Sequence, residues 1–114
     1  GEAKDGRRNR GVLIAGRAGV PVAAPRGGVV AFAGGFKSYG LLLIIEHGDD
    51  YHTLLSGMSG LDVGRGDTVR SGQRVGTLAP AADGSAVLYM ELRRSGVPVD
   101  PMPALAARED KVRG

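Results

Sequence analysis

The stretch that decides the fold is residues 20–55, which read VPVAAPRGGVVAFAGGFKSYGLLLIIEHGDDYHTLL. Short apolar runs, rich in Val, Ile and Leu, alternate here with groups of Gly, Pro, Asp and Ser. This spacing predicts short β-strands joined by tight turns. The glycine-rich turn between residues 29–33 and 41–46 predicts a hairpin, and the unbroken apolar run over 41–45 predicts a central strand covered on both faces.

The rest of the chain has the same pattern and predicts an all-β domain. Further strands are expected over residues 12–15, 20–24, 51–55, 68–69, 74–78, 86–92 and 97–99. In the strand over 86–92 the side chains alternate, so Val87, Tyr89 and Glu91 are expected to share one face.

Length and composition fit one globular domain and exclude several classes of protein. A polar lead-in (1–8) and a tail (104–114) flank the expected domain (9–103), and residues 103–111 allow one short helix. A net charge of +3 and an aromatic content of 4% argue against a nucleic-acid partner. Cysteine is absent, which excludes disulfides and thiolate metal sites. No apolar run approaches the ~18 residues needed for a membrane-spanning helix.

Four motifs resemble the LytM or lysostaphin-like zinc metallopeptidase domain, in the same order and with the same separations. They are G-x-P-V-x-A-P-x-x-G-x-V at 19–30, I-x-H-G at 45–48, G-D-x-V-x-x-G-Q-x-V-G at 66–76 and L-x-x-E-L-R at 88–93. This resemblance covers about residues 7–103. It implies an all-β fold, a two-sheet β sandwich or open barrel with a long groove. Active members use one zinc ion in that groove to cleave peptide cross-bridges of peptidoglycan.

The resemblance also indicates where active members hold and use their zinc. A His and an Asp spaced H-x-x-x-D fall on Asn9 and Leu13 in this chain, and an H-x-H pair falls on Val87 and Tyr89. A further His that assists the attacking water falls near Gly57. A catalytic zinc needs about three N, O or S donors and an open position for water. These residues therefore predict a protein that is not an enzyme and holds no metal or other cofactor.

A closer resemblance is to the EnvC-type murein hydrolase activators, through R-x-x-G-V-L-I at 8–14 and S-Y-G-L-L-L-I-I-E-H-G at 38–48. It implies a non-catalytic activator of a periplasmic zinc-dependent N-acetylmuramoyl-L-alanine amidase. The degenerate groove would bind the amidase and relieve its autoinhibition during cell separation. The resemblance implies a periplasmic location, with a signal peptide in a preceding part of the parent protein. Partner-binding residues are expected to be Arg10, Leu13, Tyr39, Val87, Tyr89, Glu91 and Arg93.

Three further interpretations bear on single residues or on the whole domain. Glu91 is expected to form an ion pair with Arg93 or Arg10 rather than to act in catalysis, because a lone carboxylate lacks a partner acid or a metal. A peptidoglycan-binding module that localises its parent protein stays open as an alternative function. Lys37 in the loop GGFKSYG suggests a lipoyl or biotinyl carrier, although the Met-Lys-Met motif of such carriers is missing.

The two histidines, His47 and His52, form another candidate pair. Together with Asp49 and Asp50 they suggest a metal site at one hairpin. A metal site needs several converging donors, so a structural or solvated role is favoured for both imidazoles.

Overall fold

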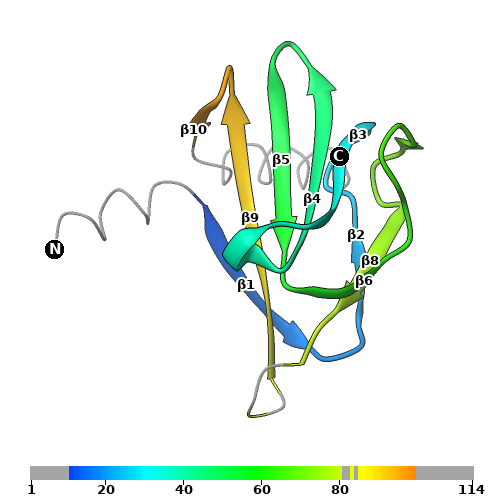
Figure 1. Ribbon diagram of the computed structural model, residues 1–114, viewed down its shortest axis with the longest axis vertical. Coiled ribbons are helices and arrows are strands. Elements are labelled where there is room, and N and C mark those ends of the chain that lie inside the picture. The colour runs from blue at the N-terminus through cyan, green and yellow to red at the C-terminus, as the bar shows by residue number, and fades with distance from the viewer. Residues whose placement is uncertain (1–10, 81–82, 84, 100–114) are drawn as a thin grey trace, which may run out of the picture.

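A computed structural model of the chain describes residues 11–80, 83 and 85–99. Nearly all of the described residues are in β-strands or in the turns between them (Figure 1). The strands are β1 (Val12–Arg17), β2 (Pro21–Ala23), β3 (Gly28–Gly35), β4 (Leu41–Gly48), β5 (Tyr51–Ser56), β6 (Met58–Leu61), β7 (Thr68–Val69), β8 (Arg74–Leu78), β9 (Ser85–Arg94) and β10 (Val97–Val99). The only described helix is a 3-10 turn, η1, at Lys37–Tyr39. The expected short helix at 103–111 lies outside the described residues.

The strands form two antiparallel sheets. The larger has the order β1-β9-β5-β4-β3-β7, with β10 also paired to β9, and the smaller has the order β2-β8-β6. The larger sheet ends at β1 and β7, so the described strands form an open sandwich and not a closed barrel. This architecture confirms the all-β, two-sheet fold expected from the sequence, whereas the groove stays a prediction. No described helix is long and apolar enough to cross a membrane.

Every strand expected from the sequence is present, and β6 is an additional one. The predicted hairpin is formed by β3 and β4, which pair from Val29 opposite Glu46 to Gly35 opposite Leu41, with a shift of register between Val30 and Phe32. Strand β4 lies between β3 and β5, as expected for a central strand.

Gly57 is the corner at which the chain leaves the larger sheet after β5 and enters the smaller one at β6. Its backbone has φ +106°, a left-handed conformation that glycine adopts without steric cost. A Cβ atom at this position would collide with the carbonyl oxygen of Val87. The corner therefore depends on glycine twice, through its backbone angle and through the close approach of β9.

The hydrophobic core lies between the two sheets. Both sheets contribute to it, through Val22, Ala24, Val30, Leu43, Ile45, Leu55, Met58, Val69, Val75, Leu78, Ala86 and Met90. Burying each large aliphatic side chain stabilises the fold by roughly 1.5–3 kcal/mol. Because successive side chains of a strand point to opposite faces, the neighbours of these residues in the larger sheet point away from the core.

We call this second side of the larger sheet the outer face. Cross-strand pairing of β1, β9, β5 and β4 places a continuous set of side chains on it. This set is Leu13, Ala15, Leu42, Ile44, Glu46, His52, Leu54, Ser56, Val87, Tyr89, Glu91 and Arg93. The outer face therefore contains most of the residues at which the sequence predicts partner binding.

Candidate functional site

Strands β1 and β9 bring three predicted residues together at one edge of the outer face. Leu13 is directly opposite Tyr89 in the antiparallel register, and Ala15 is opposite Val87. Leu13 is 71% exposed and Val87 is 41% exposed. Two large apolar side chains thus stand in solvent on either side of a tyrosine.

The turn between β3 and β4 adds a fourth predicted residue, Tyr39. This turn is closed by hydrogen bonds from the Phe36 amide to the Gly40 carbonyl (2.8 Å) and from the Tyr39 amide to the Phe36 carbonyl (3.0 Å). It folds back across β5 and β9 (Figure 1), which places the Tyr39 ring 6.3 Å from that of Tyr89. Residues far apart in sequence therefore meet on the outer face.

The Tyr39–Tyr89 contact is the end of a row of four aromatic rings. Phe32 packs edge to face on Phe36 with centroids 5.8 Å apart, and Phe36 lies 6.2 Å from Tyr39. Phe36 is exposed, and the Lys37 ammonium lies 5.3 Å from its ring centroid. Neither phenylalanine was predicted from the sequence. The sequence does contain a signal for Phe36. It lies three positions before Tyr39 in the glycine-bounded loop GGFKSYG, a spacing that suits two side chains on one side of a turn.

Tyr89, Glu91 and Arg93 form a connected trio along β9. The Tyr89 hydroxyl donates to Glu91 Oε1 at 3.2 Å, and Arg93 Nε donates to Glu91 Oε2 at 3.1 Å. The second contact confirms the expected ion pair of Glu91 with Arg93. Glu91 itself has 0% exposure, whereas Arg93 is partly exposed. Burial, together with the charge of Glu91 and the hydrogen bond donated to it, raises the pKa of Tyr89 to about 12.

The remaining positions named from the sequence are placed as follows. Arg10 and Asn9 lie outside the described residues. Gly57, where active relatives are expected to have a histidine, follows β5 directly and packs against the Val87 backbone. It has no side chain with which to bind a metal or a proton.

The two histidines do not converge. His47 Nδ1 lies 2.7 Å from the Gly27 carbonyl and Nε2 lies 2.6 Å from Thr53 Oγ1, and Thr53 is buried. His52 lies on the outer face, in register with Glu46 on one side and Arg93 on the other. His47 follows Glu46 on β4, and neighbouring residues of a strand point to opposite faces, so the two imidazoles lie on opposite sides of the sheet. His47 is therefore a structural histidine. Within the described part of the chain, no group of three or more His, Asp or Glu side chains is arranged to hold a metal ion.

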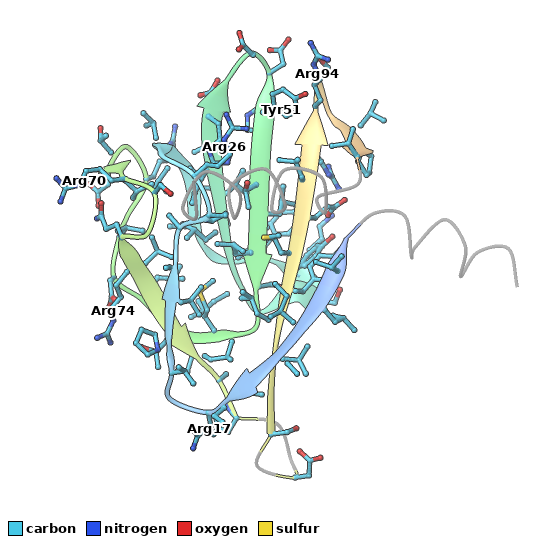
Figure 2. All side chains as sticks on the ribbon, turned by 180° about the vertical axis from the view of Figure 1, so that it is seen from behind. Arg17, Arg26, Tyr51, Arg70, Arg74 and Arg94 are labelled. Carbon is cyan, nitrogen blue, oxygen red and sulfur yellow. The ribbon has the colours of Figure 1, made fainter. Side chains whose placement is uncertain are left out.

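A separate basic cluster lies at the far end of β5. Figure 2 shows Arg26 and Arg94 close to Tyr51, with guanidinium carbons 6.0 and 5.2 Å from the ring centroid. These distances suit cation–π contacts, which are worth about 0.5–1 kcal/mol at exposed sites. Arg94 follows Arg93 on β9, so Arg94 and its register partner Tyr51 point to the opposite face of the sheet from the trio.

Comparison with known proteins agrees with this architecture. The family model described as Peptidase family M23 matches residues 7–101. The chain is 38% identical over 107 residues to the lipoprotein NlpD/LppB homolog of Pseudomonas aeruginosa, covering 93% of this chain and 36% of that protein. It is 34% identical over 101 residues to the murein hydrolase activator NlpD of Escherichia coli K12, and the match covers 88% of this chain and 27% of that protein. The chain thus spans well under half the length of these relatives.

Among solved structures, the catalytic domain of lysostaphin from Staphylococcus simulans superposes with a TM-score of 0.75 at 24% identity. The match covers 85% of this chain and 78% of that domain, and at this identity it shows the fold alone. The relatives include a murein hydrolase activator, which is the group that the motifs of the sequence resemble. The family match over most of the length and the relatives above 30% identity lead to one conclusion: this chain belongs to peptidase family M23.

Proposed function

We propose that this chain is a non-catalytic activator of a periplasmic zinc-dependent N-acetylmuramoyl-L-alanine amidase. It binds the amidase through the outer face and relieves autoinhibition of that enzyme during cell separation. The name of its Escherichia coli relative, murein hydrolase activator NlpD, supports a role of this kind. Since the chain covers only 27% of that relative, the activity of the whole protein is part of the proposal.

The observation that carries the proposal is the pairing of Leu13 with Tyr89 at two positions where active members are expected to hold zinc. A leucine side chain has no donor atom, and zinc in proteins is bound by Cys, His, Asp or Glu. Val87 and Gly57 likewise offer no donor where active members are expected to have histidines. Without the metal, no bound water has its pKa lowered to near 7 and no carbonyl is polarised.

The same residues suit protein binding. Tyr and Arg are enriched among the residues that contribute most to binding energy, and Tyr39, Tyr89 and Arg93 lie on or over the outer face. Exposed Leu13 and Val87 add apolar area beside them. An amphipathic helix of the amidase would lay its apolar side on these residues and set a carboxylate against Arg93. Arg10, which precedes β1, belongs to the proposed site on the sequence argument.

Activation follows from differential binding. If the regulatory element of the amidase is free only in its open state, the outer face binds that state alone and increases its population. The activator needs no chemistry of its own. The lipoprotein names of relatives support an extracytoplasmic location, and we propose the periplasm.

Dye release from labelled peptidoglycan sacculi tests the proposal. A panel of purified zinc amidases from Pseudomonas aeruginosa and Escherichia coli is used. The arms contain the chain alone, each amidase of this panel alone, and the chain together with each amidase. We expect release above the amidase level only in the mixture, with no release by the chain alone. Release by the chain alone that a chelator abolishes would overturn the proposal in favour of an enzyme.

A sedimentation assay with sacculi in the absence of amidase distinguishes the alternative. Co-sedimentation of the chain, together with no effect on any amidase of the panel, would instead indicate a peptidoglycan-binding module.

A further inference from the structure

Glu91 is an unusual residue for its position in the sheet. It lies on β9, between β1 and β5, with Leu54 as its register partner on β5. Its side chain has 0% exposure. Burying a carboxylate costs free energy unless its oxygens are paired, so a glutamate here requires a physical reason.

The reason lies in the two residues that flank it on the same face. Tyr89 and Arg93 are two positions before and after Glu91, so all three side chains share the outer face. One carboxylate oxygen accepts from the Tyr89 hydroxyl and the other accepts from Arg93 Nε. Within the described residues, no buried side-chain nitrogen or oxygen lacks a hydrogen-bond partner. Glu91 thus uses both of its oxygens to hold its two neighbours.

These two hydrogen bonds determine which donor and acceptor groups Tyr89 and Arg93 present to a partner protein. The hydroxyl proton of Tyr89 points to Glu91, which leaves the phenol oxygen as a hydrogen-bond acceptor toward a partner. Arg93 donates Nε to Glu91, and among the described residues no side chain or carbonyl accepts from its two terminal amino groups, so these are the donors that face a partner. The raised pKa of Tyr89 agrees with a hydroxyl that keeps its proton.

We propose that Glu91 is a positioning residue for partner binding: it orients Tyr89 as an acceptor and Arg93 as a donor without touching the partner itself. The inference rests on the proposed function, because it specifies how the same face recognises the amidase. The partner segment it fits has a donor opposite Tyr89 and a carboxylate opposite Arg93. Loss of the Glu91 charge would release both side chains.

The test measures binding of the chain to the panel of purified zinc amidases by calorimetry. Glu91→Gln keeps the shape of the side chain but places an amide where two acceptors are needed. Asp62→Asn is the matched control, since Asp62 also pairs with an arginine, Arg74, but follows β6 of the smaller sheet, away from the outer face. We expect Glu91→Gln to weaken binding by roughly tenfold or more, as for loss of a hydrogen bond to a charged group, and Asp62→Asn to leave it unchanged.

A mutant cycle distinguishes positioning from mere stability. If Glu91 acts through its two neighbours, then adding Glu91→Gln to a variant that already carries Tyr89→Phe and Arg93→Ala weakens binding no further. Additive losses, or binding by Glu91→Gln equal to that of the wild type, would overturn the inference. If Glu91→Gln does not fold, Glu91→Asp serves the same cycle, because it keeps the charge but is too short to reach both neighbours.

A measurement on the chain alone, without any amidase, separates the proposed role of Glu91 from the proposed amidase activation. Tyrosine absorbance is titrated with alkali, while circular dichroism verifies at each pH that the chain is folded. Tyr89→Phe identifies which of the three tyrosines has the pKa of about 12. In Glu91→Gln this pKa is expected to fall toward the ordinary 10.0, and an unchanged value would contradict the trio. If no amidase binds the wild type although this shift is seen, the proposed function fails while the trio stands.

Discussion

Leu13 of β1 and Tyr89 of β9 are direct partners in the antiparallel pair, and both point to the outer face of the larger sheet. The Cβ atoms of such partners lie about 4.5–5.5 Å apart, a separation from which two side chains reach one small ligand. In this chain one partner is aliphatic and the other is a tyrosine whose hydroxyl is bonded to Glu91. The pair therefore places an aliphatic side chain, which has no donor atom, beside a phenol whose proton is already engaged.

The first prediction concerns restoring the metal. The triple variant Asn9→His, Leu13→Asp and Tyr89→His should bind about one zinc per chain, because it supplies three donors and leaves one position open. Metal content after dialysis, measured by plasma mass spectrometry, checks this. Leu13→Asp alone is the control and should retain no zinc. Zinc that stays with the wild type, or none in the triple variant, would contradict the assignment of these positions. Peptidoglycan cleavage should remain absent, since Val87 and Gly57 are unchanged.

The second prediction concerns the exposed leucine. Leu13→Ala should leave the free energy of unfolding within about 0.5 kcal/mol of wild type, since the side chain is mostly in solvent. Its affinity for the amidase should fall by about 1 kcal/mol or more if the side chain is central to the interface. Urea denaturation and calorimetry measure the two quantities. Val97→Ala, at an apolar position of β10 that is 61% exposed, is the control and should change neither.

The third prediction concerns the corner between the sheets. Gly57→Ala should destabilise the fold, by about 1–3 kcal/mol from the left-handed backbone alone, with a further cost from the collision with Val87. Thermal and urea denaturation measure the loss. Gly60→Ala is the matched control, because a Cβ atom at Gly60 would meet nothing within 4 Å beyond its two chain neighbours. Equal stability of the two variants would show that the corner does not require glycine.

The fourth prediction concerns pH. Burial lowers the pKa of His47 below 6.5, which outweighs the opposing effect of its hydrogen bond to the Gly27 carbonyl. The folded state therefore favours the neutral ring. The stability this contributes is fully present above the unfolded pKa of about 6.5 and is lost as the pH falls through the lower folded pKa.

Urea denaturation from about pH 7.5 down to about pH 5 should accordingly show a falling free energy of unfolding. The decline should be smaller in His47→Gln, which has no ring to protonate. Parallel pH profiles for the two proteins would refute a role for His47 in this dependence.

Much of the fold is predictable from the sequence because its strands are local features. Residues 41–45 are apolar without interruption and residues 86–92 alternate, and both became strands of the larger sheet. Strand β6 was not predicted, since its sequence MSGL contains Ser and Gly and follows β5 after one glycine with no turn between them. Among the described strands it pairs only with β8, with an irregular register, so its extended form depends on a partner more than ten residues further along the chain.

The candidate site is less local than the strands. Alternation correctly placed Val87, Tyr89 and Glu91 on one face, and the charge pattern correctly paired Glu91 with Arg93. Of the four rings in the aromatic row, the sequence predicts a binding role for Tyr39 and Tyr89 but not for Phe32 or Phe36. Ring contacts between a turn and a strand fifty residues later depend on how the β3–β4 turn folds over the sheet.

The sequence by itself determined the strand pattern, the family and the absence of donor side chains at Leu13, Val87 and Gly57. These properties follow from residue types and their spacing, which act over a few neighbouring positions. Only the tertiary structure decided that Leu13 lies opposite Tyr89, that the Tyr39 ring packs near the Tyr89 ring, and that Glu91 is buried. Register and burial are set by packing between strands from distant parts of the chain, and no local pattern specifies them.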